Sequence, residues 1–170
     1  MFGTDLGRRA LAQIELKPGT LYIFQDKRAD RALGLYNLMK SKDREVLVVT
    51  RLHPDRLIED FQIPSSNVYW LSNSAGARNI NPQNIGILTD TLIRMYEKGG
   101  AAVIFEGIEY LMLQNDLSKV LKLMSYLYES VAVNQGMLVI TLDPEAFNTK
   151  EFALLTKDAE LVGETESVFI

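Results

Sequence analysis

The stretch AAVIFEGIEYL, residues 101–111, decides the fold. Its first five residues are all apolar, and a strand without polar alternation is typically buried on both faces, as in a parallel sheet covered by helices. An acid, Glu106, and a glycine, Gly107, end this run before a second apolar segment begins. The stretch therefore predicts a central parallel strand with a polar group at its carboxyl end.

Four other runs have the same continuous apolar character. They are LYIF (21–24), VLVV (46–49), VYWL (68–71) and MLVITL (137–142). Segments with the apolar spacing of amphipathic helices lie between or after them, around residues 29–40, 82–98, 116–133 and 149–157. Asn81, followed by Pro82, and Asp116 are predicted to cap two of these helices. The alternation predicts an α/β doubly wound fold, with a mostly parallel five-stranded sheet and helices on both faces.

The two ends of the chain carry separate predictions. Residues 1–17 are expected to be a helical extension, because apolar residues share one helical face over residues 4–14. Residues 18–170 are expected to form a single α/β domain. Near the C-terminus, AELV and ESVFI flank a Gly-Glu-Thr turn, which predicts an antiparallel hairpin at one edge of the sheet.

The composition excludes several classes of protein and of site. Of 170 residues, 47% are apolar and 24% are charged, which argues against disorder, a collagen repeat and a coiled coil. No apolar run approaches the roughly 20 residues that a bilayer needs, and no secretory signal is recognisable, so a cytoplasmic location is expected. The lack of cysteine excludes disulfides and thiol chemistry, and the single histidine, His53, excludes zinc sites built on two histidines.

Charge is distributed unevenly along the chain. The formal net charge is −4, but 11 basic and 7 acidic side chains lie up to Arg56, against 7 and 15 after it. The overall balance argues against a nucleic-acid binder that relies on broad phosphate neutralisation. The densest basic stretch, DKRADR (26–31), is interpreted as a solvated helix face, with a phosphate or partner contact as the alternative.

Candidate functional residues follow from the predicted sheet. In open parallel sheets, ligands bind beyond the carboxyl ends of the strands. Polar side chains at those ends, and in the polar loop SNSAGARNINP (72–82), are the candidate contacts for a ligand or partner: Lys27, Arg28, Arg51, Asn73, Arg78, Glu106, Glu109 and Asp143. Arg51 is expected to organise an internal ion pair or to contact an anion or a partner. No catalytic residue is assigned.

The loop after the first strand, QDKRADRALG (25–34), lacks the residues of a phosphate-binding loop. Such loops supply glycine amides and a lysine followed by serine or threonine, whereas here the first glycine is Gly34. Glu106 has the position of a magnesium-binding acid, but the preferred interpretation is that it pairs with Arg51 or caps a neighbouring loop. A carboxylate cluster of Glu106, Glu109 and Asp143 that binds a divalent ion is the weaker alternative. No cofactor and no metal are expected.

Six segments of the chain resemble an archaeal family of unknown function, DUF835. They are PGTLYIF, VLVVTRLHPDRL, VYWLS, INPQNI, AAVIFEGIEYLMLQND and LVITLDPEAF, and the resemblance runs from about Pro18 to Leu161. That family is similar to a degenerate RecA or KaiC ATPase domain without the phosphate-binding loop. The resemblance implies the sheet order 5-1-4-2-3, with strands numbered along the chain, and a hairpin beyond strand 5. It implies no activity, cofactor or catalytic residue, and Glu106 departs from the aspartate expected there.

Two functions of different classes are therefore predicted. The first is a non-catalytic, RecA/KaiC-like interaction domain in regulation or signalling, whose partner is a protein: a second copy, as in a homodimer, or a KaiC-like ATPase. The alternative is a residual binder of a nucleotide or phosphometabolite through Lys27, Arg28 and Arg51. Nucleic-acid binding by the basic N-terminal part is a third and least favoured hypothesis, and no contact with a membrane is expected.

Overall fold

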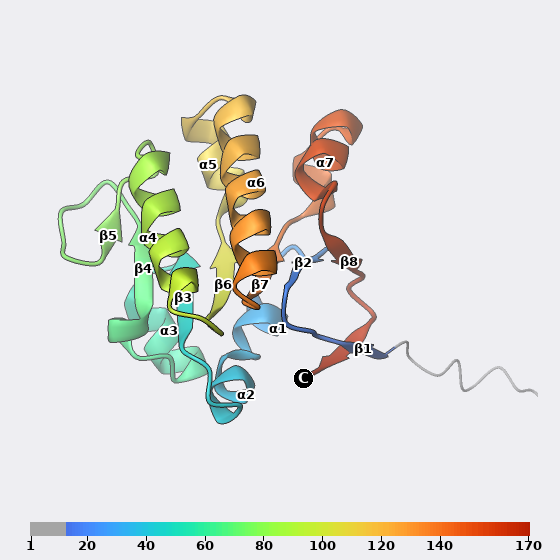
Figure 1. Ribbon diagram of the computed structural model, residues 1–170. Helices are drawn as coiled ribbons and strands as arrows, with labels where there is room; N and C mark the ends of the chain where they lie inside the picture. Colours follow the sequence, from blue (N-terminus) through green and yellow to red (C-terminus); the bar gives the residue numbers. More distant parts are fainter. Residues whose placement is uncertain (1–12) are drawn as a thin grey trace, which may run out of the picture.

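The computed structural model describes residues 13–170, and its main feature is a seven-stranded parallel sheet (Figure 1). The order of the strands across the sheet is β5-β4-β3-β6-β7-β2-β8. Their bounds are β2 (Thr20–Phe24), β3 (Val46–Thr50), β4 (Val68–Leu71), β5 (Asn79–Ile80), β6 (Ala102–Glu106), β7 (Met137–Thr141) and β8 (Glu160–Val162). Each of the five predicted runs forms one of these strands, so the parallel α/β architecture is confirmed.

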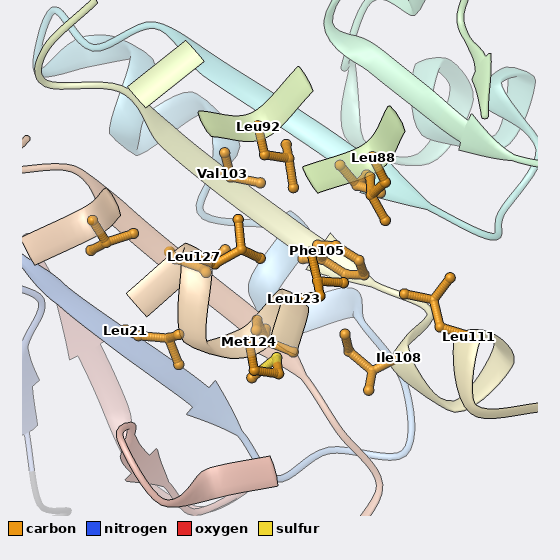
Figure 2. Packing of buried hydrophobic residues seen from close by; sticks show 14 of the residues in the cluster. Leu21, Leu88, Leu92, Val103, Phe105, Ile108, Leu111, Leu123, Met124 and Leu127 are labelled. Carbon is orange, nitrogen blue, oxygen red and sulfur yellow. The ribbon is translucent and has the colours of Figure 1, made fainter. Parts of the chain in front are cut away.

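Helices cover both faces of the sheet, as predicted (Figure 1). They are α1 (Asp30–Leu33), α2 (Tyr36–Ser41), α3 (Pro54–Phe61), α4 (Ile85–Glu97), α5 (Ile108–Gln114), α6 (Leu117–Val133) and α7 (Thr149–Thr156). One core cluster joins α4, α5, α6 and α7 to one face. In Figure 2, Leu92 of α4 lies beside Val103 of β6, Leu88 lies closer to Phe105, and Leu127 of α6 packs nearby. A second cluster joins α1, α2 and α3 to the opposite face.

The predicted sheet order is wrong in one respect. With the five predicted strands numbered along the chain, the order is 1-5-4-2-3, because β7 lies between β6 and β2. Strand β7 pairs along all five residues with both neighbours, from Met137 to Thr141. The chain passes from β6 through α5 and α6 directly to the adjacent strand, which is the commoner arrangement for consecutive strands. Strands β5 and β8 extend the sheet from five strands to seven.

The predicted C-terminal hairpin is not formed. Strand β8 pairs in parallel with β2, and β9 (Ser167–Phe169) pairs in parallel with β1 (Gln13–Glu15) in a separate two-stranded sheet. Arg31 holds the connection between β8 and β9, because its Nη1 donates to the carbonyl of Gly163 at 2.9 Å and to that of Glu166. The predicted turn is present, since the Glu166 amide donates to the Gly163 carbonyl at 3.1 Å, but the strands on its two sides pair with different partners.

Several helix boundaries also differ from the predictions. The segment around 29–40 forms two short helices that are separated at Gly34 and Leu35. Helix α4 starts at Ile85, since the Asn81 side chain accepts a hydrogen bond from the Gln83 amide and forms a turn in place of a helix cap. Residues 13 and 14 of the predicted N-terminal helix belong to β1, and residues 1–12 lie outside the described residues. Within residues 13–170, no helix has the length and apolar character needed to cross a membrane.

Gly136, which precedes β7, has no space for a side chain. A Cβ at this position would lie 2.5 Å from Cδ1 of Tyr96, whose ring is fully buried and whose hydroxyl donates to the Met137 carbonyl at 2.9 Å. Because the core is close-packed, we expect Gly136→Ala to lower the free energy of unfolding by about 1–3 kcal/mol, as measured by urea unfolding.

Gly86 in α4 provides the matched control for this substitution. The nearest atom to an added Cβ there is 4.0 Å away. Gly86→Ala should therefore increase the free energy of unfolding by roughly 0.5–1 kcal/mol, because alanine favours the helix. Similar effects of the two substitutions would contradict the packing described here.

Candidate functional site

A pocket of about 590 Å³ lies at the carboxyl edge of the parallel sheet. Because all strands of the sheet run in the same direction, β2, β3, β6 and β7 end at this edge and their following loops form its wall. The pocket is lined by six of the eight predicted contact residues: Lys27, Arg28, Arg51, Glu106, Glu109 and Asp143. Sequence reasoning therefore placed most of the candidate side chains at one site.

Two predicted contact residues lie elsewhere. Asn73 is exposed in the loop between β4 and β5. Arg78 lines a separate groove, where its guanidinium lies 5.4 Å from the centre of the Tyr69 ring. The polar loop that contains Asn73 and Arg78 thus does not contribute to the pocket.

The floor of the pocket is formed by Glu106, Glu109 and Thr141, which are buried or half-buried. Glu106 and Thr141 are directly paired residues at the ends of β6 and β7. In a strand, residues two positions apart lie on the same face, so Glu106 shares the face of Ile104 and Thr141 shares the face of Val139. Ile104 and Val139 belong to the core on the side of α1, α2 and α3. Both side chains therefore project side by side towards that layer.

Thr141 was not identified from the sequence. It was treated as part of an apolar strand, although it is the polar residue of the run MLVITL. Its side chain is 5% exposed, and its Oγ1 has no hydrogen-bond partner among residues 13–170. A buried hydroxyl without a partner is unusual, because leaving a polar group unpaired is costly.

The floor carboxyl groups are held by backbone amides. Glu106 Oε1 accepts from the Arg51 amide at 3.2 Å, and Glu109 Oε1 accepts from the Asp143 amide at 2.8 Å. Burial raises the pKa of Glu106 to about 7, the Arg51 amide opposes this, and the neighbouring Glu109 carboxylate adds to it. Burial also raises the pKa of Glu109, which the Asp143 amide partly offsets. Glu106 is therefore poised to gain or lose a proton near neutral pH.

Arg51 does not form the ion pair that the sequence suggested. Its guanidinium lies on the ring of Tyr110, 3.4 Å from the ring centre, and makes no salt bridge or side-chain hydrogen bond with another residue of 13–170. The Trp70 indole N–H donates to the Arg51 carbonyl at 3.1 Å, and the His53 ring packs edge-on against Trp70. Hydrogen bonds to its amide and to its carbonyl thus fix the backbone of Arg51, while its guanidinium can still donate hydrogen bonds to a ligand.

The exposed rim of the pocket carries paired charges. Lys27 pairs with Glu145 at 3.0 Å, Arg28 with Asp30 at 3.0 Å, and Arg56 with Asp60 at 3.7 Å. Such exposed pairs contribute little to stability. The alternative of a metal-binding carboxylate cluster is not supported: in the described part of the chain, no three His, Asp or Glu side chains are arranged to hold an ion.

A family model described as "Protein of unknown function (DUF835)" matches residues 25–158, including every residue of the pocket floor. The chain belongs to the DUF835 family. The resemblance stated from the sequence is thereby confirmed. No curated protein sequence matches this DUF835 chain.

Solved structures of two archaeal proteins share the fold of this DUF835 chain. The flagellar accessory protein FlaH from Methanocaldococcus jannaschii is 14% identical, with a TM-score of 0.60 over 87% of this chain and 72% of FlaH. PH0250 from Pyrococcus horikoshii OT3 is 9% identical, with a TM-score of 0.58 over 86% of this chain and 82% of PH0250. At these identities the likeness shows a shared RecA-like α/β fold and nothing about activity.

The buried carboxyl of Glu106 should make the stability of the DUF835 domain depend on pH. Its pKa is about 7 in the folded chain and about 4.5 when unperturbed, so the folded chain binds more protons between these values. The free energy of unfolding should therefore fall as pH rises through this window. Between pH 5 and pH 8, the decrease in the free energy of unfolding should be smaller in Glu106→Gln than in the natural sequence by on the order of 2 kcal/mol, as measured by urea unfolding.

Glu97→Gln serves as the control, because Glu97 is exposed at the end of α4. This variant should keep the pH profile of the natural sequence. A profile for Glu106→Gln that parallels the natural one would show that Glu106 ionises normally in the folded chain.

Proposed function

We propose that this DUF835 chain acts by binding a partner and does not transfer phosphoryl groups. The observation that carries the proposal is the segment between β2 and α1. A P-loop enzyme needs glycine amides around the phosphates, a lysine that reaches them and a helix N-terminus that faces them. Here residues 25–29 contain no glycine, Lys27 pairs with Glu145, and α1 has only four residues.

The same segment is tied to another part of the domain. Asp26 accepts a hydrogen bond from Arg31 Nε at 3.0 Å, and the Arg31 guanidinium also lies over the Phe24 ring. Through its bonds to the carbonyls of Gly163 and Glu166, Arg31 links this loop to the β8–β9 connection. These contacts support a structural use of the position at which a phosphate loop would lie.

A protein is the partner that we favour, in a regulatory or signalling role. It is either a second copy of this chain or a RecA/KaiC-like ATPase. FlaH is described as a flagellar accessory protein, and an accessory role agrees with binding without turnover, although fold likeness supports this only by analogy. The rim of the pocket also supports it, because exposed and weakly held ion pairs can exchange partners with charges on another surface.

A second candidate function is the binding of a small molecule, and a specific observation favours it. The pocket volume of about 590 Å³ lies in the range of small-molecule sites. One wall presents the unpaired Arg51 guanidinium, which can contact an anionic group such as a phosphate. Lys27 and Arg28 at the rim could assist, since their present partners are exposed acids.

Nucleotide assays test the proposed lack of phosphoryl transfer. We expect the purified full chain to hydrolyse neither ATP nor GTP in the presence of magnesium, because no phosphate loop positions the substrate. The readout is phosphate release, with Glu106→Gln as the matched variant. Turnover that Glu106→Gln abolishes would refute the proposal.

Thermal unfolding with nucleotides distinguishes the two candidates. A ligand at 100 times its dissociation constant adds about 2.7 kcal/mol of stability, which should raise the Tm by several degrees. We expect no shift with magnesium-bound ATP, ADP or GTP if the partner is a protein. A shift that is lost in the triple variant Lys27→Ala, Arg28→Ala, Arg51→Ala, but kept in Arg94→Ala, would favour the second candidate.

A further inference from the structure

We propose that the pocket binds a small zwitterion, a molecule with a carboxylate and a protonated amine, such as an amino acid or a dipeptide. Arg51 would bind the carboxylate, and Glu106 with Thr141 would bind the amine. The inference rests on the proposed function only in that the pocket binds and does not catalyse.

Arg51 is suited to a carboxylate because of how its guanidinium is held. It lies over the Tyr110 ring, 3.4 Å from the ring centre, and makes no ion pair or hydrogen bond with another side chain of residues 13–170. A planar guanidinium can donate two parallel hydrogen bonds to a carboxylate, and an aromatic surface beneath it restricts its orientation. The Trp70 indole bonds the Arg51 carbonyl, and the Glu106 carboxyl bonds the Arg51 amide, so the backbone of Arg51 is already fixed. Arg51 therefore loses little conformational entropy when a ligand binds.

The floor favours a cation over a second anion. Glu106 and Glu109 are both half-buried carboxyl groups, and Oε2 of Glu106 accepts no hydrogen bond from residues 13–170. A phosphate placed against this floor would meet two acids in a partly dehydrated site. An ammonium group would instead compensate the charge of Glu106, which is otherwise costly to bury.

Thr141 supplies an independent indication of a ligand. Its hydroxyl is buried and without a partner among residues 13–170, and it belongs to the residue paired with Glu106 across β6 and β7. An ammonium has three donors, so one group can bond the Glu106 carboxylate and, after rotation of the Thr141 side chain, the hydroxyl as well. The same ligand would therefore satisfy two groups that the domain leaves unpaired.

The remaining charges around the pocket do not alter this choice. On the rim, Lys27, Arg28 and Arg56 face Glu145, Asp30 and Asp60 as neutral pairs, and Asp143 lies beside Glu109. Among the described residues that line the pocket, Arg51 is therefore without an ion-pair partner, as are the carboxyl groups of Glu106, Glu109 and Asp143. Arg51 and Glu106 are neighbours, since the Arg51 amide donates to Glu106 Oε1 at 3.2 Å. Leu52 and Phe61 line the space between rim and floor and could contact an apolar side chain of the ligand.

Thermal unfolding of the full chain with the twenty amino acids and their common dipeptides tests the proposal. At least one should give a saturable rise in Tm at up to about 10 mM. Its affinity should fall at least tenfold in Arg51→Ala and in Glu106→Gln, since each removes a hydrogen bond to a charged group. Arg94→Ala and Glu97→Gln, which alter exposed side chains of α4, should leave the affinity unchanged.

The dependence of affinity on pH then separates a zwitterion from a phosphate. Because the pKa of Glu106 is about 7, an ammonium that binds its ionised form should bind about fivefold more tightly at pH 7 than at pH 6, a range in which the ligand amine stays protonated, and should release a proton. Inorganic sulfate, used as a phosphate-like dianion whose charge is constant in this range, should instead bind less tightly as Glu106 ionises. Absence of any saturable shift, full affinity in Glu106→Gln or weaker binding at higher pH would each overturn the proposal. None of these results bears on phosphoryl transfer, which the hydrolysis assay measures separately.

Discussion

The position of β7 between β6 and β2 determines where the side chains of the pocket lie. Hydrogen bonds along five residues on each side fix its register, so Thr141 is paired with Glu106 on one side and with Phe24 on the other. The parallel direction of the strands brings all their carboxyl ends to one edge. Layers of helices on both faces bury β6 and β7 almost completely, which leaves this edge as the place where polar side chains of the central strands can emerge.

The floor of the pocket does not stabilise the fold. Two carboxyl groups and one hydroxyl are removed from water there, and the backbone amides of Arg51 and Asp143 compensate only part of the cost. Apolar side chains at these positions would suit the surrounding core better. Residues whose environment shifts their pKa and lowers stability are concentrated at functional sites, and here they occur together with a cavity.

The sequence predicts the strands and the membership of the pocket better than it predicts the sheet. Continuous apolar runs identify the central strands because burial on both faces is a local property, and the carboxyl-edge rule then places Arg51, Glu106, Glu109 and Asp143 together. Which strands are neighbours depends on packing between distant segments, so β7 was misplaced. The hairpin is absent for the same reason: β8 pairs with β2 and β9 with β1, and Arg31 bonds the carbonyls of Gly163 and Glu166, so its two strands depend on contacts with distant segments that no local pattern encodes.

The likeness to RecA-like proteins describes the scaffold, and the charges at the edge decide what it can hold. A phosphate site of this fold class places positive charge and amide donors in the loop after the first strand. In the described part of this chain, that loop pairs its cations with acids, whereas Arg51, which follows β3, has no ion-pair partner and Glu106 and Glu109 lie on the floor. The pocket therefore presents a guanidinium, held over the Tyr110 ring, together with the carboxyl groups of its floor. A ligand with one charge can compensate only one of these groups, whereas a ligand with two opposite charges can compensate both.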